Sequence, residues 1–441
     1  MKKVIIYGAG GNYIDFASWI KERYEIVALV DGDHNKWGKK QEGILIENPV
    51  MIAERDFDFI IVTPTDGESI ADYLRSEYSL STSKVELLET LVYGLKKDKH
   101  LSICFLIVGG LGDAIINYNY IYAFYKRFSQ SEISIDIANA SNAFISFAGN
   151  SKFISNFVDI EFDRTDYDLV FELRRYPRII RAEFFRVAKI APQLMDYLIK
   201  CRRFEYDNPN RIHFGPRYDG YNEKTKVELF GKRYLQPDID GEFKLTELYL
   251  PDIEVDLDLL RQFGLEDSKY ITIHRGCDKF FFSKTNVKLW PEKNYEELMV
   301  LFKNSFPDYK IVLIGEEYEK SELIRHYDLN LLGKTNMPQL KAIIKGAAIH
   351  IDTEGGLVHM RHSLKGGKSV VLFGPTSDEF FGYPENINIR TNDCPNPCEW
   401  KTKDWAVNCS NSEAKHICME SITPQMIIQQ VEEAEVLCKR K

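Results

Sequence analysis

Residues 351–359, Ile-Asp-Thr-Glu-Gly-Gly-Leu-Val-His, combine backbone and side-chain groups that suit phosphate binding. The pair Gly355-Gly356 would let the backbone approach a ligand closely, because neither residue has a side chain. A helix that begins near Leu357 would direct its free N–H groups at that ligand, which favours phosphate. Asp352 and His359 add a carboxylate and an imidazole on either side of the turn. The segment therefore predicts a nucleoside diphosphate pocket in an α/β domain.

A second glycine turn, Gly109-Gly110-Leu111-Gly112-Asp113, follows the apolar run Ser102–Val108. A near-continuous apolar run is typical of a strand buried on both faces. Three glycines in four positions permit close backbone approach, and Asp113 precedes a helix expected from Ala114 to Phe128. Asp113 could be only the N-cap of that helix, worth about 1 kcal/mol, or it could also line a cleft.

The chain begins with another such turn, Gly8-Ala9-Gly10-Gly11-Asn12. It meets the dinucleotide pattern G-x-G-x-x-G only in part, because Tyr13 takes the place of the last glycine. Asp31 ends the second expected strand, where a ribose-binding acid would stand. The unit resembles the small N-terminal Rossmann-like domain of bacterial sugar acyltransferases. A working nucleotide site and a scaffold without a ligand both stay open.

Four cysteines, Cys394, Cys398, Cys409 and Cys418, lie within 25 residues near the C-terminus. The chain lacks a signal-peptide pattern and an 18-residue apolar run, so we expect it in the cytoplasm. Clustered thiols in that compartment favour a metal over disulfides. A tetrahedral site for zinc or iron is predicted, with zinc as the default of the ligand chemistry. Scattered reduced thiols are the alternative.

The elements that must position these residues form three α/β units, expected over residues 1–97, 98–255 and 256–441. In each unit apolar runs end in polar turns and alternate with helical periodicity, which predicts parallel sheets. The expected strands are Glu25–Val30, Phe57–Thr63, Ile133–Ala138, Leu169–Leu173, Tyr270–His274 and Lys310–Ile314, and the expected helices are Ile14–Arg23, Gly67–Ser76, Tyr295–Phe306, Ser321–Tyr327, Pro338–Gly346 and Thr423–Leu437.

The formal net charge of −9 argues against a general nucleic-acid binder, whose surface would be basic. One run, residues 172–203, reverses this charge locally. A solvated basic face and a surface for an anionic substrate or a membrane both fit that run. Its arginines are Arg174, Arg175, Arg178, Arg181, Arg186, Arg202 and Arg203.

Three co-linear motifs resemble those of glycosyltransferase family 9, the ADP-heptose transferases. They are the turn Gly109–Asp113, the element Lys288-Leu289-Trp290-Pro291, and the block Asp352–His359 with Leu372–Thr376. The resemblance covers residues 101–430. It implies a GT-B fold, in which an N-terminal Rossmann-like half binds the acceptor and a C-terminal half binds the nucleotide sugar.

The resemblance also implies roles for single residues. Asp113 would be the general base, Lys288 would neutralise the departing diphosphate, and no catalytic metal would be needed. Glu319 would bind the donor ribose, with Glu316 as a rival. The other expected donor contacts are Arg275, Asp352 (to sugar hydroxyls), Thr353, Gly355, Gly356, Leu357 and His359, and the expected acceptor-side residues are Gly110, Arg174 and Arg175.

The chain also departs from the family pattern. Arg275 replaces a proline that is usual in the element Ile273–Gly276, and Glu354 is added to the donor turn. These departures leave the donor sugar open. Some relatives, the autotransporter heptosyltransferases, hold iron on a similar cysteine cluster.

We therefore expect an inverting glycosyltransferase that moves a heptose from ADP-heptose to a hydroxyl of a surface glycan precursor or a protein. A UDP-sugar-using GT-B enzyme, such as another transferase or a sugar epimerase, is the first alternative. A non-catalytic assembly module is the second. Peripheral contact with the inner membrane face and homo-oligomer formation are left open.

Overall fold

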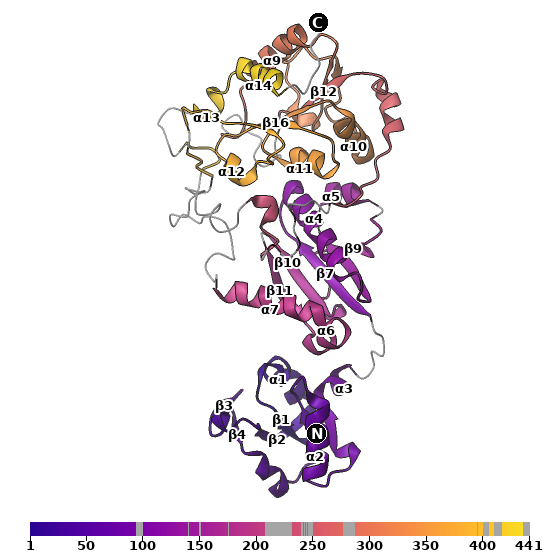
Figure 1. The fold of residues 1–441 in the computed structure, drawn as a ribbon, viewed down its shortest axis with the longest axis vertical. Coiled ribbons are helices and arrows are strands. Elements are labelled where there is room, and N and C mark those ends of the chain that lie inside the picture. Colours follow the sequence, from indigo (N-terminus) through magenta and orange to yellow (C-terminus); the bar gives the residue numbers. More distant parts are fainter. Residues whose placement is uncertain are drawn as a thin grey trace. The chain divides into compact units, whose positions relative to one another are not determined.

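The computed structural model falls into two compact units. Unit 1 comprises residues 1–100 and 183–190, and unit 2 comprises residues 101–182 and 191–441 (Figure 1). The predicted boundary at residue 255, inside unit 2, stays a prediction. The structure describes residues 1–93, 100–139, 141–149, 151–174, 176–207, 232–239, 241, 243, 245, 250–276, 287–394, 396–399, 405–409 and 417–434.

Unit 1 is built on a six-stranded sheet in the order β3-β4-β2-β1-β5-β6, in which only β3 and β4 pair antiparallel. Separate clusters of buried apolar residues cover its two faces, as a doubly covered parallel sheet requires. Its elements are β1 (Lys2–Tyr7), α1 (Gly11–Arg23), β2 (Tyr24–Val30), β3 (Lys40–Gln41), β4 (Ile44–Glu47), β5 (Phe59–Val62), α2 (Gly67–Glu77), β6 (Val85–Leu87), α3 (Leu88–Tyr93) and α6 (Phe184–Ile190).

Helix α6 belongs to unit 1 although the residues on both sides of it belong to unit 2. Phe185 is buried in the core cluster that surrounds β1 and α1. Arg186 donates a hydrogen bond to the His100 carbonyl (2.7 Å), and Lys189 forms an ion pair with Glu89 (3.1 Å). Apolar packing and these polar contacts together hold α6 in unit 1.

The first half of unit 2 contains a five-stranded sheet in the order β11-β10-β7-β8-β9. Its pairings are parallel except that of β10 with β11. The elements are β7 (Leu101–Ile107), α4 (Leu111–Phe128), β8 (Ile133–Ala138), α5 (Asn142–Ala148), β9 (Asn156–Val158), β10 (Leu169–Leu173), β11 (Pro177–Ala182) and α7 (Pro192–Asp207).

The second half contains an all-parallel sheet in the order β14-β13-β12-β15-β16-β17. Its elements are β12 (Tyr270–Ile273), α9 (Glu292–Ser305), β13 (Lys310–Leu313), β14 (Leu329–Asn330), α10 (Met337–Gly346), β15 (His350–Thr353), α11 (Gly356–Ser363), β16 (Ser369–Leu372), α12 (Asp378–Phe381), β17 (Ile387–Ile389), α13 (Ile417–Glu420) and α14 (Pro424–Glu433).

The helix expected at Ser321–Tyr327 is wrong. The chain forms only a short 3-10 turn, η8 (Glu317–Glu319), which a capping box between Glu316 and Glu319 closes. The N–H groups of Arg325 and His326 then donate to the Glu296 carboxylate instead of to helix carbonyls. A tertiary contact thus replaces the helix.

The two sheets of unit 2 meet through their helices, since α4 contacts α11 and α5 contacts α10 (Figure 1). Each sheet has its first strand, β7 or β12, in a central position. Loops after such central strands form the ligand-binding edge of doubly wound sheets. Unit 2 is therefore a GT-B fold, preceded by a small Rossmann-like α/β domain, and the predicted fold class is confirmed. In the part of the chain that is described, no helix is long and apolar enough to cross a membrane.

Candidate active site

The turn between β7 and α4 brings a carboxylate against glycine backbone. Gly109 has φ +140°, and a Cβ there would lie 2.7 Å from the Cβ of Asp113 and 2.8 Å from its carboxylate. Gly110 is the N-cap of α4, so Asp113 lies within the first helical turn. The interpretation of Asp113 as the N-cap is therefore wrong. Its side chain is 44% exposed, which leaves it accessible to a substrate.

This turn faces the turn between β15 and α11. A Cβ on Gly112 would meet the His359 ring at 2.8 Å, and one on Gly356 would meet the Gly112 backbone nitrogen at 3.4 Å. Further along both helices, Asn119 donates a hydrogen bond to Ser363 (3.0 Å). The N-termini of α4 and α11 are thus neighbours across the two halves, and each has free backbone N–H groups.

The predicted donor residues around α11 lie at this junction. Thr353 ends β15 and is buried, and Gly355 is the extended N-cap of α11, with φ −178°. Any residue could adopt that φ, so Gly355 is not required by backbone strain. Gly356 and Leu357 occupy the first turn of α11, where their N–H groups have no helical partner.

Lys288 is held by the acid that is added to the donor turn. Its Nζ lies 3.0 Å from the Glu354 carboxylate, and the two side chains are 21% and 11% exposed. It also lies 5.9 Å from the centre of the Trp405 ring. An incoming diphosphate would therefore compete with Glu354 for this ammonium group.

His359 is buried next to both turns. One ring nitrogen, Nδ1, is 2.9 Å from the Tyr383 hydroxyl. Burial, together with the positive charge of Arg233, lowers the pKa of His359 to about 3. A neutral imidazole can order the turn and exchange hydrogen bonds, but it supplies no charge to a phosphate.

A line of buried acids and imidazoles joins the 3-10 turn η8, the residue that follows β12, and β15. His274 Nδ1 lies 2.8 Å from Asp352, and its Nε2 lies 3.4 Å from Glu319. Asp352 also contacts His350 (3.3 Å). Burial alone would lower the pKa of His274, but Asp352 and Glu319 raise it to about 10. His274 is therefore a fixed cation between two carboxylates.

Asp352 and Glu319, two of the residues predicted to bind the donor, are both engaged in these contacts. Asp352 is 1% exposed, and both its oxygens are engaged by histidines. Glu319 is equally buried: one oxygen accepts from the Glu316 N–H, and the other has no partner among the described residues. The free oxygen of Glu319 suits a hydroxyl group better than either oxygen of Asp352 does.

Arg275 is 5% exposed and forms an ion pair with Glu292 (2.9 Å). Its Nε is buried without a partner in the described part of the chain. It borders a cavity of about 430 Å³ that Ser321, Asn330 and Leu332 also line. The predicted contact between Arg275 and the donor stays a prediction.

Four arginines of the run at residues 172–203, namely Arg174, Arg178, Arg202 and Arg203, pair with acids of the same half of unit 2. Arg174 bonds to Glu172 (2.5 Å), and Arg178 lies near Glu172 and Glu205. Arg175, the other arginine expected at the acceptor, lies outside the described residues. Ion pairs at such exposed positions contribute little stability, so pairing leaves the run available to a substrate.

Sequence reasoning did not find Arg233. Its Nη2 lies 2.5 Å from Asp113 Oδ1, and its side chain is 3% exposed. The partners are 120 residues apart, and Arg233 stands in a segment without periodicity, so no local pattern indicated the contact. The same holds for His274, whose two acids come from later elements, Glu319 from η8 and Asp352 from β15.

The four cysteines lie close together in space. Burial and the nearby Cys394, Cys398 and Cys409 together raise the pKa of Cys418 to about 12. Among the described residues, none of the four forms a disulfide. Within the described ranges, no group of three or more His, Cys, Asp or Glu side chains is placed to hold a metal ion. The donor set nevertheless fits zinc or iron chemically, and the metal stays a prediction.

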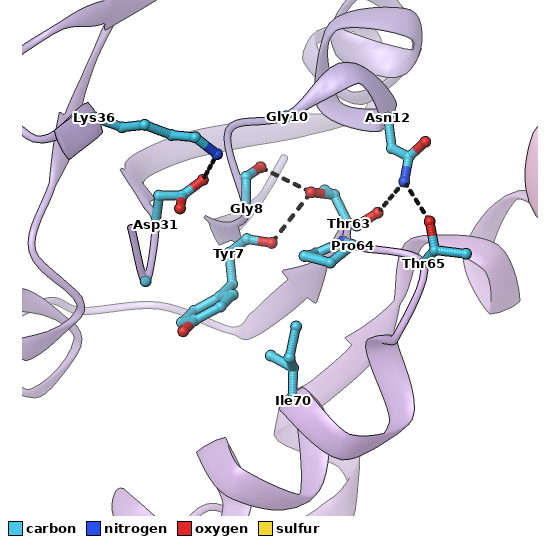
Figure 2. Close-up of a pocket in the computed structure, with 11 residues that line it drawn as sticks. Tyr7, Gly8, Gly10, Asn12, Asp31, Lys36, Thr63, Pro64, Thr65 and Ile70 are labelled. Carbon is cyan, nitrogen blue, oxygen red and sulfur yellow. Dashed lines mark hydrogen bonds and ion pairs between the residues drawn. The ribbon is translucent and has the colours of Figure 1, made fainter. Parts of the chain in front are cut away.

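Unit 1 has its own cavity, of about 390 Å³, at the turn between β1 and α1 (Figure 2). Asp31 points into it, but its carboxylate accepts from the Ala9 and Asp33 N–H groups and from Lys36 (2.9 Å). Burial opposes ionisation, yet Lys36 and these N–H groups lower the pKa of Asp31. The expected ribose-binding acid is thus already engaged within its own fold.

Packing also accounts for the first glycine of this turn. Gly8 has φ +105°, and a Cβ there would lie 2.6 Å from Pro64 and from the Thr63 hydroxyl. That hydroxyl donates to the Gly8 carbonyl, and Asn12 donates to the Thr63 carbonyl (Figure 2). These contacts explain Gly8 without a ligand.

Comparisons with known proteins match different families to the N-terminal and the C-terminal parts of the chain. Residues 234–414 match the family model described as glycosyltransferase family 9 (heptosyltransferase), and residues 1–85 match the model C2185-like, N-terminal. A comparison with curated protein sequences gives no match.

Three solved structures are similar to the chain. ADP-heptose LPS heptosyltransferase II of E. coli shares 18% identity over 76% of this chain and 98% of that one, with a TM-score of 0.46. A glycosyl transferase family 9 protein of Veillonella parvula shares 15% over 76% and 97%, with a TM-score of 0.49. The dodecameric, iron-containing heptosyltransferase TibC of enterotoxigenic E. coli, in complex with ADP-D-β-D-heptose, shares 14% over 77% of each chain, with a TM-score of 0.49. The chain therefore contains a region, residues 234–414, that matches glycosyltransferase family 9 (heptosyltransferase), and a C2185-like N-terminal region at residues 1–85.

Proposed function

We propose that the chain transfers a heptose from ADP-heptose to a hydroxyl group of a surface glycan precursor or a protein, with inversion at the anomeric carbon. One observation carries the proposal: the N-termini of α4 and α11 adjoin, with Asp113 on one side and Lys288 on the other. The family model that matches residues 234–414 is itself described as a heptosyltransferase model, which supports heptose as the sugar.

The chemistry follows from this arrangement. Asp113 accepts the proton of the attacking hydroxyl, and the hydroxyl oxygen forms a bond to the anomeric carbon. The bond from that carbon to the diphosphate breaks on the opposite face, which inverts the configuration. Lys288 and the free N–H groups of Gly356 and Leu357 receive the negative charge of the leaving diphosphate.

The donor would be held by residues that are already buried. The unpartnered oxygen of Glu319 suits a ribose hydroxyl, because a buried acceptor without a partner costs about 1–3 kcal/mol. Burial opposes ionisation of Asp352, but His274 and His350 lower the pKa of this acid. His359 orders the turn below the phosphates.

Mass spectrometry of the full chain incubated with a panel of nucleotide sugars tests the donor. ADP release from ADP-heptose, with transfer of the heptose to an acceptor extract, is expected. Conversion of UDP-N-acetylglucosamine in the absence of an acceptor would instead favour an epimerase. Full cellular activity of a folded Asp113→Ala, Lys288→Ala protein would favour an assembly module.

We further propose that Cys394, Cys398, Cys409 and Cys418 hold a structural zinc or iron ion, as their convergence around Cys418 suggests. Elemental analysis of the purified chain should find about one metal ion per chain, and Cys418→Ser should lower both metal content and melting temperature. A metal-free wild-type protein of equal stability would contradict this assignment.

A further inference from the structure

Arg233 has a nitrogen that the proposed mechanism does not use. One guanidinium nitrogen, Nη2, contacts Asp113 and the Arg174 carbonyl (3.1 Å). The other, Nη1, is buried and has no partner among the described residues. An arginine stays charged at any pH a protein experiences, and a buried donor left unpaired costs about 1–3 kcal/mol.

Gln236, three residues after Arg233, also has buried polar atoms without a partner among the described residues. It follows the 3-10 turn η5 (Arg233–Leu235) as its C-cap and is 2% exposed. Neither its amide nitrogen nor its amide oxygen has a partner in the described ranges. Residues three apart are eclipsed in a 3-10 turn. Arg233 and Gln236 therefore present two unsatisfied polar groups on one face of η5.

The same turn also reaches the donor half. The Tyr234 ring stacks on the Tyr383 ring, with centroids 4.8 Å apart and an interplanar angle of 23°. The Tyr383 hydroxyl is the partner of His359. Segment 233–236 thus lies between the proposed base and the donor turn, where an acceptor must enter.

We propose that Arg233 and Gln236 bind an anionic group, a carboxylate or a phosphate, that the acceptor carries next to its attacking hydroxyl. This inference rests on the proposed function, since it takes Asp113 as the base. The terminal nitrogens Nη1 and Nη2 of Arg233 belong to one planar group. An anion oxygen that accepts a hydrogen bond from Nη1 would therefore lie beside the acceptor hydroxyl whose proton Asp113 accepts.

Charge balance explains why the group should be anionic and not a neutral hydroxyl. Before transfer, Asp113 compensates the charge of Arg233. Once Asp113 takes the proton it becomes neutral, and a buried guanidinium without a counter-ion is unfavourable. An anion on the acceptor compensates Arg233 at that moment, and the Gln236 amide donates to a second oxygen of the same anion.

The test measures binding of three probes to the full chain saturated with ADP: methyl α-glucoside, methyl α-glucuronide and methyl α-glucoside 6-phosphate. Wild type should bind at least one charged probe about tenfold or more tightly than the neutral one, because hydrogen bonds to charged groups are strong. The better of the two charged probes identifies the anion. Equal binding of all three, or binding of none, would overturn the proposal.

Variants of Arg233 and Gln236 test whether the preference for a charged probe depends on these two residues. Arg233→Met should abolish it, Arg233→Lys should keep part of it, and Gln236→Leu should reduce it several-fold. Arg261→Met is the matched control, because Arg261 lies on another 3-10 turn, is 71% exposed and, among the described residues, pairs with Asp258 alone. A preference that survives in Arg233→Met would refute the assignment.

ADP affinity and melting temperature show whether each variant is folded. If Arg233→Met loses ADP binding but keeps the probe preference, Nη1 serves the donor and the inference fails. If wild type never turns over ADP-heptose but the preference depends on Arg233, the anion site stands and the transferase proposal fails.

Discussion

Two glycine turns of this chain each follow the first strand of a sheet, but the acid near each turn has different surroundings. At the turn after β1 in unit 1, Asp31 accepts hydrogen bonds from the Ala9 N–H group and from Lys36, and the described residues that line the cavity all belong to unit 1. The turn after β7 in unit 2 leaves Asp113 44% exposed and lies against a second turn, at Gly356. A glycine turn becomes a candidate transfer site when a second set of N–H groups faces it.

The largest effect should come from the acids themselves. Asp113→Asn removes the proton acceptor and should slow transfer by about 10²–10⁴-fold. Asp31→Asn should leave the rate unchanged, because Asp31 serves the fold of unit 1. Both rates are measured as ADP release from the sugar donor. Equal losses in the two variants would break the comparison.

The two units also neutralise a buried acid differently, unit 1 with a lysine and unit 2 with His274. The pKa of His274 in the folded chain, about 10, exceeds its unfolded value, so its stabilisation is complete below about pH 6.5 and is lost as the pH rises toward 10. Wild type should lose up to about 1.4 kcal/mol per pH unit between pH 7 and 9 through this group.

Urea denaturation at several pH values measures this loss. His274→Gln should be less stable at pH 7, and its stability should fall less steeply with pH than that of wild type. The difference between the two proteins is the readout, because other groups titrate equally in both. Parallel curves would show that His274 is not a buried cation.

Lys288 and Lys36 provide the next contrast, since each pairs with an acid near a glycine turn. Lys288→Met should weaken ADP binding about 10- to 100-fold, the usual worth of a charge-assisted hydrogen bond. Lys36→Met should not change it. Calorimetry with ADP compares the two, and an equal loss would mean that unit 1 contributes to nucleotide binding.

The smallest effect concerns the glycines. Gly112→Ala would place a Cβ 2.8 Å from the His359 ring and should reduce transfer about tenfold, a cost of about 1.4 kcal/mol. The Cβ of Gly11→Ala would meet no described residue within 4 Å, and this change should stabilise α1 slightly. Transfer rate and melting temperature are the two measurements. A neutral Gly112→Ala would mean that the facing turns separate easily.

Most of the scaffold could be predicted from local sequence patterns. Apolar runs gave strands such as Ile133–Ala138 and Leu169–Leu173 with their observed bounds. Helix α4 begins three residues earlier than expected, because backbone at Gly110 starts the helix and leaves Asp113 inside it. Hydrophobic periodicity is a local signal, so it predicts strands and helices well where local packing determines the structure.

The pairings within the site could not be predicted in this way. Arg233 meets Asp113, His274 meets Asp352, and Glu354 meets Lys288 across separations of 66 to 120 residues. Such contacts depend on how elements pack, which no short spacing encodes. The sequence pattern indicated the candidate site residues near the glycine turns, but it did not indicate the oppositely charged residues that pair with them.

The membership of α6 in unit 1 determines where the gene can be divided. A fragment that ends at residue 100 would lack Phe185, and the core cluster around Val4 and Ile6 would be open to water. A fragment that starts at residue 101 would carry the same phenylalanine, 4% exposed in the whole chain, on its surface. Exchange of the N-terminal domain between relatives therefore requires two grafted segments, residues 1–100 and 183–190 together.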